Sequence, residues 1–224
     1  MAAFTRIPII AANWKMYKTA AETTDFLRAF LPEIAGVSGL DIIVAPPFTA
    51  LFAASQMLSG SSLVSLAAQN MYFERQGAFT GEISTAMLGE FGVRWVIIGH
   101  SERRHIFGED DGIIALKVKS ALGSGLRPIL CIGEKLEERD GGLTFAVLER
   151  QLSSALSSLD PDMMDGVAVA YEPVWAIGTG KTASLSQAQE AHFYIRSWLR
   201  RNFNSAIADS IRIMYGGSVK PENV

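Results

Sequence analysis

Residues 167–183 read VAVAYEPVWAIGTGKTA, and the order of residue types in this stretch indicates both a fold class and a site. Its first five residues, Val167 to Tyr171, are apolar or aromatic throughout, as expected of a strand that is buried on both faces. Glu172 follows at once, and then a proline and a run that contains two glycines. A buried strand that ends directly in a carboxylate and a loop is typical of parallel sheets that gather polar groups at their strand ends.

Similar short apolar runs recur along the whole chain. They lie at Pro8 to Ala12, Asp41 to Ala45, Leu63 to Ala68, Trp95 to Ile98, Pro128 to Ile132 and Ile211 to Tyr215. Because most of them are apolar at nearly every position, we expect seven strands that are buried on both faces, as in a parallel sheet covered by helices.

Helical spacing of apolar residues appears between these runs. Residues 26–34 and 143–159 each show one apolar stripe, and Ser184 with Gln187 has the spacing of a capping box at the start of another. That third stripe comprises Ala188, Ala191, Ile195, Trp198 and Leu199. Strands that alternate with helices predict an α/β fold.

The turn after the first strand separates two α/β architectures. It reads Asn13-Trp14-Lys15-Met16, which lacks the G-x-G-x-x-G pattern of a doubly wound dinucleotide-binding sheet. The sequence therefore favours a parallel (β/α) barrel, and a chain of 224 residues without a composition break predicts one domain over residues 1–224.

Composition and charge limit the cellular locations and the partners that we expect for the chain. The chain is 49% hydrophobic and 19% charged, yet no apolar run approaches the ~20 residues of a membrane span. Met1 to Arg6 show no basic segment followed by a long apolar stretch, so we expect a cytoplasmic protein. A net charge of −3 without a polybasic run argues against nucleic acid or a membrane as partner. The single cysteine, Cys131, excludes an internal disulfide, and its apolar surroundings predict a buried core thiol.

Polar residues follow four of the seven predicted strands. The first strand leads into Asn13 and Lys15, the fourth into residues 100–102 (His-Ser-Glu), the sixth into Glu172 and the seventh into residues 216–218 (Gly-Gly-Ser). Each of these positions taken alone is compatible with a surface residue that caps a helix. A base, an imidazole, an ammonium group and a glycine-rich anion loop at one end of a barrel together predict a catalytic site.

Six motifs carry a resemblance to a known family. They are Asn13-Trp14-Lys15, Ala68-Gln69-Asn70, Gly77 to Glu82 (GAFTGE), Gly99 to Arg104 (GHSERR), Ala170 to Lys181 (AYEPVWAIGTGK) and Tyr215 to Val219 (YGGSV). In this order, from residue 13 to the end of the chain, they resemble the signatures of the triosephosphate isomerase family. The resemblance implies interconversion of dihydroxyacetone phosphate and D-glyceraldehyde 3-phosphate through an enediolate, with no cofactor and no metal.

The resemblance also implies a role for each matching catalytic residue. Glu172 would be the base that removes a carbon proton, and His100 would move a proton between the two substrate oxygens. The helix that we expect to start at Ser101 would favour a neutral imidazole at His100. Lys15 would supply a fixed positive charge, and Asn13 would hold a substrate oxygen beside it. Glu102 resembles the carboxylate that accompanies them, although a structural ion pair with an arginine is an open alternative.

Two further segments resemble parts of the family that surround the substrate. Gly178, Gly217 and Ser218 would bind the phosphate, together with Asn13 and Lys15. A closing lid would comprise Pro173, Val174, Trp175, Ala176, Ile177, Gly178, Thr179, Gly180, Lys181, Thr182 and Ala183, with proline stiffening its first hinge and glycines allowing its tip to bend.

The long segment from Asn70 to Glu82 resembles the loop through which the family forms dimers. Thr80 would then lie near Asn13 and Glu102 of a second copy, which predicts a homodimer. His105 and His192 match no family site, and we expect both to be ordinary helix or surface residues.

The chain differs from the family pattern at its C-terminal end. The family barrel has eight βα units, whereas this sequence stops at Val224, where the seventh helix would begin. We therefore expect a barrel domain without its eighth unit, and truncation of a longer enzyme is the favoured explanation. Two alternatives stay open: an impaired, non-catalytic fragment that needs a complementing piece, and another phosphate-binding barrel enzyme such as an aldolase, for which Lys15 is the Schiff-base candidate.

Overall fold

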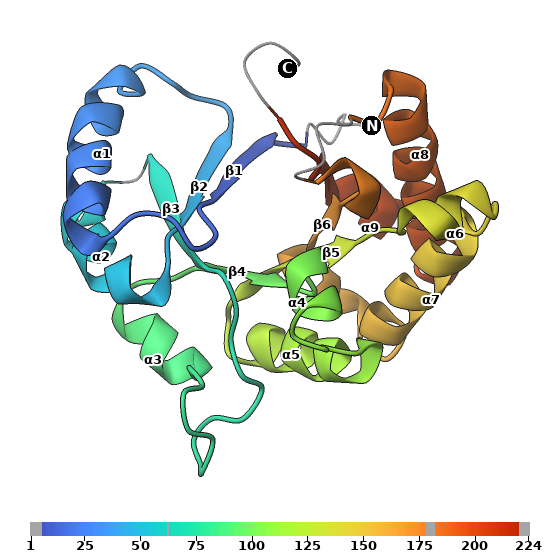
Figure 1. Ribbon diagram of the computed structural model, residues 1–224, viewed down its shortest axis with the longest axis horizontal. Helices are drawn as coiled ribbons and strands as arrows, with labels where there is room; N and C mark the ends of the chain where they lie inside the picture. The colour runs from blue at the N-terminus through green and yellow to red at the C-terminus, as the bar shows by residue number, and fades with distance from the viewer. Residues whose placement is uncertain (1–5, 62, 178–181, 220–224) are drawn as a thin grey trace. The chain divides into compact units, whose positions relative to one another are not determined.

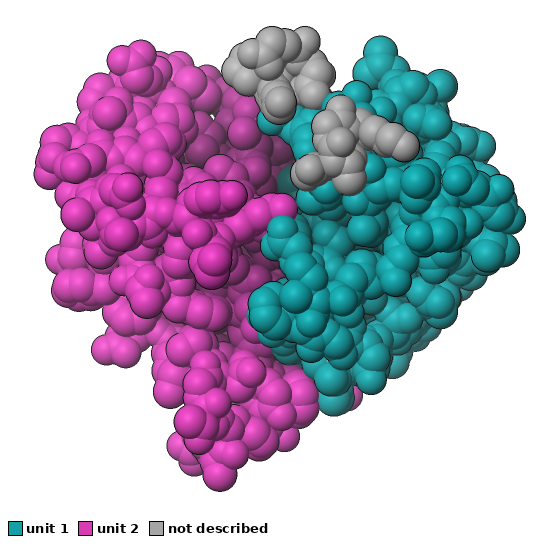
Figure 2. All heavy atoms as spheres, viewed as in Figure 1, with its two compact units in different colours: residues 1–6, 99–118, 129–224 teal, residues 7–98, 119–128 magenta. Residues whose placement is uncertain are grey.

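The computed structural model describes residues 6–61, 63–177 and 182–219, and the chain divides into two compact units (Figures 1 and 2). Unit 1 comprises residues 1–6, 99–118 and 129–224, and unit 2 comprises residues 7–98 and 119–128. None of the helices in the described ranges is long and apolar enough to cross a membrane.

The described residues of unit 2 form four parallel strands that follow one another in sequence order. They are β1 (Ile9–Asn13), β2 (Asp41–Ala45), β3 (Val64–Ala68) and β4 (Trp95–Ile98). Ile9 lies opposite Asp41 in the register of β1 with β2, and β3 pairs with both β2 and β4. The predicted parallel pairing of consecutive strands is confirmed here.

The helices of unit 2 connect these strands. They are α1 (Ala20–Glu33), the 3₁₀ turn η1 (Phe48–Ala50), α2 (Leu51–Leu58) and α3 (Thr85–Glu90). Helix α1 begins in a capping box, in which the Thr19 side chain accepts from the Glu22 amide and the Glu22 side chain accepts from the Thr19 amide. Helices α1 and α2 pack side by side (Figure 1), and Leu27 of α1 and Ala54 of α2 are fully buried.

Unit 1 repeats the alternation of strand and helix. Its strands are β5 (Arg127–Ile132), which belongs to unit 1 from Ile129 on, β6 (Ala168–Tyr171) and β7 (Arg212–Tyr215), paired in parallel as β5–β6 and β6–β7. The helices of this part of the chain are α4 (Ser101–His105), α5 (Asp111–Gly123, in unit 1 up to Val118), α6 (Leu136–Asp140), α7 (Thr144–Leu156), η2 (Pro161–Gly166), η3 (Val174–Ala176), α8 (Leu185–Asn202) and α9 (Ser205–Ser210).

Two helices of unit 1 confirm the predictions from spacing. Helix α8 starts in a capping box between Ser184 and Gln187, and Ala191, Ile195, Trp198 and Leu199 form its buried face. Helix α7 buries the stripe that was expected between residues 143 and 159. Local capping and apolar period therefore fix where these helices start and which side faces the core.

The prediction that all seven strands are buried on both faces is wrong for β1 and β7. Strands β2, β4, β5 and β6 are almost entirely buried, whereas Ile10 in β1 is 60% exposed and every residue of β7 is half-buried. Among the described residues of its own unit, β1 pairs only with β2 and β7 only with β6. An apolar run indicates a strand, but its burial also depends on whether a neighbour covers each edge and face.

Candidate active site

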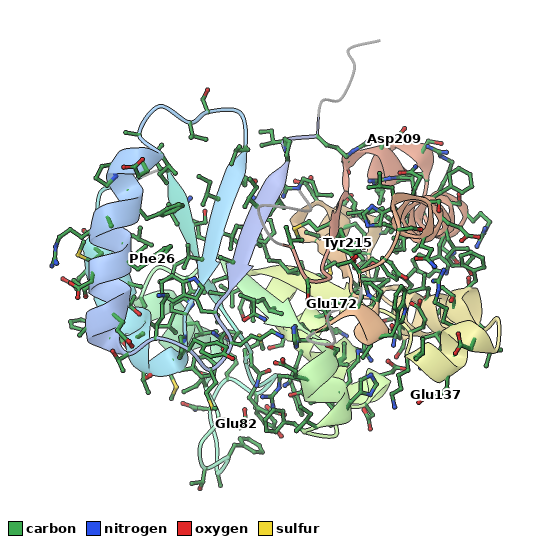
Figure 3. The ribbon with its side chains drawn as sticks, turned by 45° about the horizontal axis from the view of Figure 1, so that its top comes forward. Phe26, Glu82, Glu137, Glu172, Asp209 and Tyr215 are labelled. Atoms are coloured by element: carbon green, nitrogen blue, oxygen red, sulfur yellow. The ribbon has the colours of Figure 1, made fainter. Side chains whose placement is uncertain are left out.

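Glu172 and His100 lie together in unit 1. Glu172 follows β6 directly, its side chain is 7% exposed, and its Oε1 atom lies 3.4 Å from Nε2 of His100. The other carboxylate oxygen, Oε2, accepts a hydrogen bond of 3.0 Å from the backbone amide of Ser101. The structure thus brings together the predicted base and the predicted imidazole, with Glu172 labelled in Figure 3.

The hydrogen bond at the other ring nitrogen determines how His100 can act. Nδ1 of His100 accepts from the backbone amide of Glu102 at 3.2 Å, in the first turn of α4. A nitrogen that accepts carries no proton, so the neutral ring bears its proton on Nε2, the atom that faces Glu172. The Glu102 carboxylate lies 3.6 Å from Nδ1, but the amide already occupies this acceptor, so we regard the amide as the partner that fixes the ring.

Two glycines leave room for Glu172. A Cβ atom at Gly216 would lie 2.8 Å from Cγ of Glu172, and one at Gly133 would lie 1.8 Å from its backbone oxygen. The backbone amide of Glu172 also donates to the carbonyl of Ile132 at 2.7 Å, and Gly216 donates to the carbonyl of Tyr171. Glu172 is therefore held by the ends of β5 and β7 as well as by its own strand.

The predicted phosphate and lid residues are described in part. Gly217 and Ser218 follow β7 and are half-buried, whereas Gly178, Thr179, Gly180 and Lys181 lie outside the described residues. Val174 to Ala176 form the turn η3 after Pro173. At the C-terminal end of the predicted lid, the Ala183 amide donates to the hydroxyl of Tyr215 at 3.3 Å.

Asn13 and Lys15 lie in unit 2, at the end of β1. The Asn13 side-chain oxygen accepts from the Lys15 amide at 3.0 Å, and Lys15 has a positive φ of 50°. Gln69 donates to the carbonyls of Lys15 and Ala45, both at 2.8 Å. A left-handed conformation is unfavourable for lysine, so other contacts must hold it. The hydrogen bonds from the Lys15 amide to Asn13 and from Gln69 to the Lys15 carbonyl hold the backbone of this predicted binding residue in place.

Thr80 lies on the long connection between β3 and α3, which projects away from the strands of unit 2 (Figure 1). It is exposed, as are its neighbours from Glu74 to Glu82. Phe79 is 40% exposed although its ring packs against Tyr72 at 4.6 Å between centroids.

The sequence is similar to that of a known protein family over most of its length. The family model described as triosephosphate isomerase matches residues 8–224. The chain belongs to the triosephosphate isomerase family. Proteins named triosephosphate isomerase from Carboxydothermus hydrogenoformans, Syntrophotalea carbinolica and Chloroflexus aurantiacus are 52%, 54% and 51% identical to it. These alignments cover 98% of this chain and 87%, 86% and 87% of the respective relatives.

Membership in the triosephosphate isomerase family confirms the fold class predicted from the sequence, a parallel (β/α) barrel in which the structure describes seven strands. It also favours an isomerase over the non-catalytic fragment and the aldolase that the sequence left open.

Glu134 is a buried carboxylate near the predicted base, and the sequence analysis did not identify it. Glu134 is fully buried two residues after β5, and it accepts from the hydroxyl of Tyr171, from Nε1 of Trp175 at 3.0 Å and from Nη1 of Arg139 at 3.1 Å. Its backbone oxygen accepts from Val174 as well. Glu134 therefore binds both the residue before Glu172 and the turn after it. The signal was available, since Glu134 is a polar residue at a strand end.

The cysteine and the two other histidines lie in surroundings that fit structural roles. Cys131 is 2% exposed, which confirms the core thiol, and burial raises its pKa well above the usual value, with the nearby Glu172 carboxylate adding to the shift. His105 is exposed at the end of α4, and His192 packs its ring edge-on against Tyr171. Within residues 6–61, 63–177 and 182–219, no three His, Cys, Asp or Glu side chains are grouped to hold a metal ion.

Proposed function

We propose that this chain is a triosephosphate isomerase that interconverts dihydroxyacetone phosphate and D-glyceraldehyde 3-phosphate. The observation that carries the proposal is the pairing of a buried Glu172 carboxylate with the Nε2 atom of His100 at 3.4 Å. A carboxylate beside a ring N–H supplies a base for a carbon proton and a donor for the neighbouring carbonyl oxygen.

In the proposed reaction, Glu172 removes a proton from the carbon next to the carbonyl. The electron pair of that C–H bond forms the carbon–carbon double bond of an enediolate, and Nε2–H of His100 donates to the oxygen on which negative charge develops. Glu172 then returns its proton to the neighbouring carbon, after His100 has moved a proton between the two oxygens. Burial of Glu172 suits this chemistry because a site closed to water protects the enediolate from side reactions.

Lys15, Asn13 and Glu102 complete the proposed catalytic set. Lys15 provides a fixed positive charge for the phosphate and the developing enediolate, and Asn13 binds a substrate oxygen. The contact between the Asn13 side chain and the Lys15 amide supports the assignment of this pair, because it holds one residue relative to the other. Glu102 contributes mainly through its backbone amide, which orients His100.

The phosphate binds, in this proposal, to the backbone and hydroxyl groups of Gly178, Gly217 and Ser218. The segment Pro173 to Ala183 acts as a lid that excludes water, because an enediolate phosphate in water can expel its phosphate group. Hydrogen bonds from Trp175 to Glu134 and from Ala183 to Tyr215 support this assignment, since they anchor the segment close to each end.

We further propose a homodimer in the cytoplasm that serves glycolysis and gluconeogenesis, built from one barrel domain per chain. The exposed loop around Thr80 and the large exposed side chains of Met16 (94%) and Tyr17 (73%) support a protein partner for unit 2. Light scattering after size exclusion tests the dimer, which predicts twice the chain mass of 24.3 kDa at micromolar concentration.

The experiment that tests the reaction follows isomerisation of D-glyceraldehyde 3-phosphate by the purified chain. A dehydrogenase that reduces the ketose product of the triose phosphate reports its turnover. Unphosphorylated glyceraldehyde and a pentose phosphate aldose serve as control substrates, and nuclear magnetic resonance follows their conversion. We expect turnover of the triose phosphate alone. Turnover of the pentose phosphate instead would indicate a different sugar phosphate isomerase.

A further inference from the structure

Arg104 is a buried cation that contacts the backbone next to His100, and the proposed reaction gives it no role. It lies in α4, and its side chain is only 7% exposed. Burying a guanidinium is costly unless its donors are satisfied, so the groups that it binds indicate what it does.

The guanidinium of Arg104 donates in three directions. Nε donates to the carbonyl of Gly99 at 2.8 Å, Nη2 donates to the carbonyl of Cys131 at 3.3 Å, and Nη1 donates to Oδ1 of Asp111 at 2.6 Å. Asp111 opens helix α5, and its other oxygen lies 3.1 Å from Nε of Arg150. The carboxylate therefore balances the buried charge and holds the fork in place.

The carbonyl of Gly99 belongs to the peptide group that leads into His100. Gly99 has a φ of +75°, and a Cβ atom there would lie 3.1 Å from both Nη2 of Arg104 and the oxygen of Cys131. Glycine is needed at this position for its conformation, and the close approach of Arg104 fills the space that a side chain would take. Arg104 thus fixes the peptide plane from which the imidazole projects.

The carbonyl of Cys131 lies one residue before Ile132, whose own carbonyl accepts from the backbone amide of Glu172. Arg104 consequently contacts the backbone next to His100 and the strand that holds the backbone of Glu172. It also belongs to α4, whose first turn provides the Glu102 amide that occupies Nδ1 of His100. The Arg104 side chain thus contacts two of these backbone segments and shares a helix with the amide that binds the ring.

We propose that Arg104 is a positioning residue that fixes the orientation and tautomer of His100. The inference rests on the proposed function for its effect on turnover, but its effect on the ring is independent of activity. Arginine suits the task because its planar fork reaches three acceptors at fixed angles, whereas a lysine ammonium is a single point of attachment.

A purely structural role would give a different result from a positioning role, and the chain offers a matched control. Arg196 also donates to two backbone carbonyls, those of Ala208 and Ile211, at the C-terminal end of α9 and away from Glu172 and His100. Arg196 is half-buried, and Arg196→Met removes its two backbone contacts from unit 1 while leaving those of Arg104 in place.

The test compares Arg104→Met, Arg104→Lys and Arg196→Met with the parent chain. The ¹⁵N spectrum of ¹⁵N-histidine-labelled protein, in which His100→Gln assigns one of the three histidines, reports the tautomer of each ring. We expect a single Nε2–H tautomer for His100 in the parent and in Arg196→Met, and a tautomer mixture in Arg104→Met. We also expect kcat to fall about 10- to 100-fold in Arg104→Met with KM within about threefold, and Arg104→Lys to recover part of it.

Unchanged His100 resonances in folded Arg104→Met, or an equal loss of kcat in Arg196→Met, would overturn the proposal. Should Arg104→Met fail to fold, Asp111→Asn replaces the carboxylate that holds the fork, and the same shift toward a tautomer mixture is required of it. A parent chain without isomerase activity would contradict the proposed function, while the ¹⁵N spectra would still decide the role of Arg104.

Discussion

Nδ1 of His100 accepts a hydrogen bond from the backbone amide of Glu102, two residues further along the chain, at 3.2 Å. The relationship is set by the start of α4, because an amide in the first helical turn has no partner within the helix and points toward the preceding residues. The free ring N–H is thereby directed at the Glu172 carboxylate. The start of a short helix thus determines the chemistry of the ring.

Replacing His100 by glutamine tests this arrangement. A glutamine side chain can donate to the substrate oxygen, but its amide cannot take a proton from one oxygen and return it to the other. We expect kcat to fall about 10²-fold or more with the fold retained, as is typical for loss of a proton-transfer group. Turnover of His100→Gln at the parent rate, measured by the coupled assay, would contradict the assignment of His100.

Glu134 provides a prediction about stability. In Glu134→Gln, an amide N–H₂ replaces one oxygen of a fully buried carboxylate that accepts from Tyr171, Trp175 and Arg139. A donor would then face other donors, and we expect a loss of about 1–3 kcal/mol in the free energy of unfolding. Urea denaturation of Glu134→Gln measures it. Glu137→Gln, at an exposed position of α6, is the control, and an equal effect in both variants would rule out the role of the buried site.

Substitution of Gly216 tests how closely the Glu172 side chain is held. Gly216→Ala would place Cβ 2.8 Å from Cγ of Glu172, so the carboxylate must shift. We expect kcat to fall roughly 10- to 100-fold, because displacements of about 1 Å have such effects on positioned groups. Gly89→Ala is the matched control, since Cβ at Gly89 meets nothing within 4 Å. Equal kcat values for the two variants would show that the space at Gly216 does not matter.

His192 predicts how stability changes with pH. Burial lowers its pKa, the charge of Arg196 lowers it further, and Nε2 is buried without a hydrogen-bond partner among the described residues. The unfolded chain, with a histidine pKa near 6.5, therefore binds a proton more readily than the folded chain. The contribution of neutral His192 to the free energy of unfolding is fully present above about pH 6.5. It is lost as the pH falls toward the lower folded-state pKa.

His192→Gln removes this ionisable group, and the comparison with the parent isolates its effect. We expect the free energy of unfolding of the parent, measured in urea between pH 7.5 and pH 5, to fall more steeply than that of His192→Gln. A difference between the two proteins that is the same at every pH would contradict the prediction.

The sequence predicted strands and helices well where local chemistry determines them. The capping-box spacing of Ser184 and Gln187 predicted the start of α8, and the apolar runs predicted the positions of β2, β4, β5 and β6. Burial of β1 was predicted wrongly, because an apolar run carries no information about which neighbours cover it, and Ile10 is largely exposed.

Residue types in the sequence proposed the members of the candidate site, but they did not predict the contacts between them. Strand-end polarity located Glu172 and His100, yet the amide of Ser101 and the guanidinium of Arg104 act through backbone geometry that residue types do not reveal. Glu134 was overlooked even though it satisfies the same strand-end rule. Its three donors come from residues 139, 171 and 175, and only the folded chain brings them to one carboxylate.

The central claim is that the Glu172 carboxylate removes the carbon proton. The most direct test measures kcat of Glu172→Gln for D-glyceraldehyde 3-phosphate, together with the affinity of the variant for a phosphate-bearing competitive inhibitor. The proposed mechanism predicts a fall in kcat of about 10²- to 10⁴-fold, with inhibitor affinity and the far-ultraviolet circular dichroism spectrum close to those of the parent. Turnover at the parent rate in Glu172→Gln would contradict it.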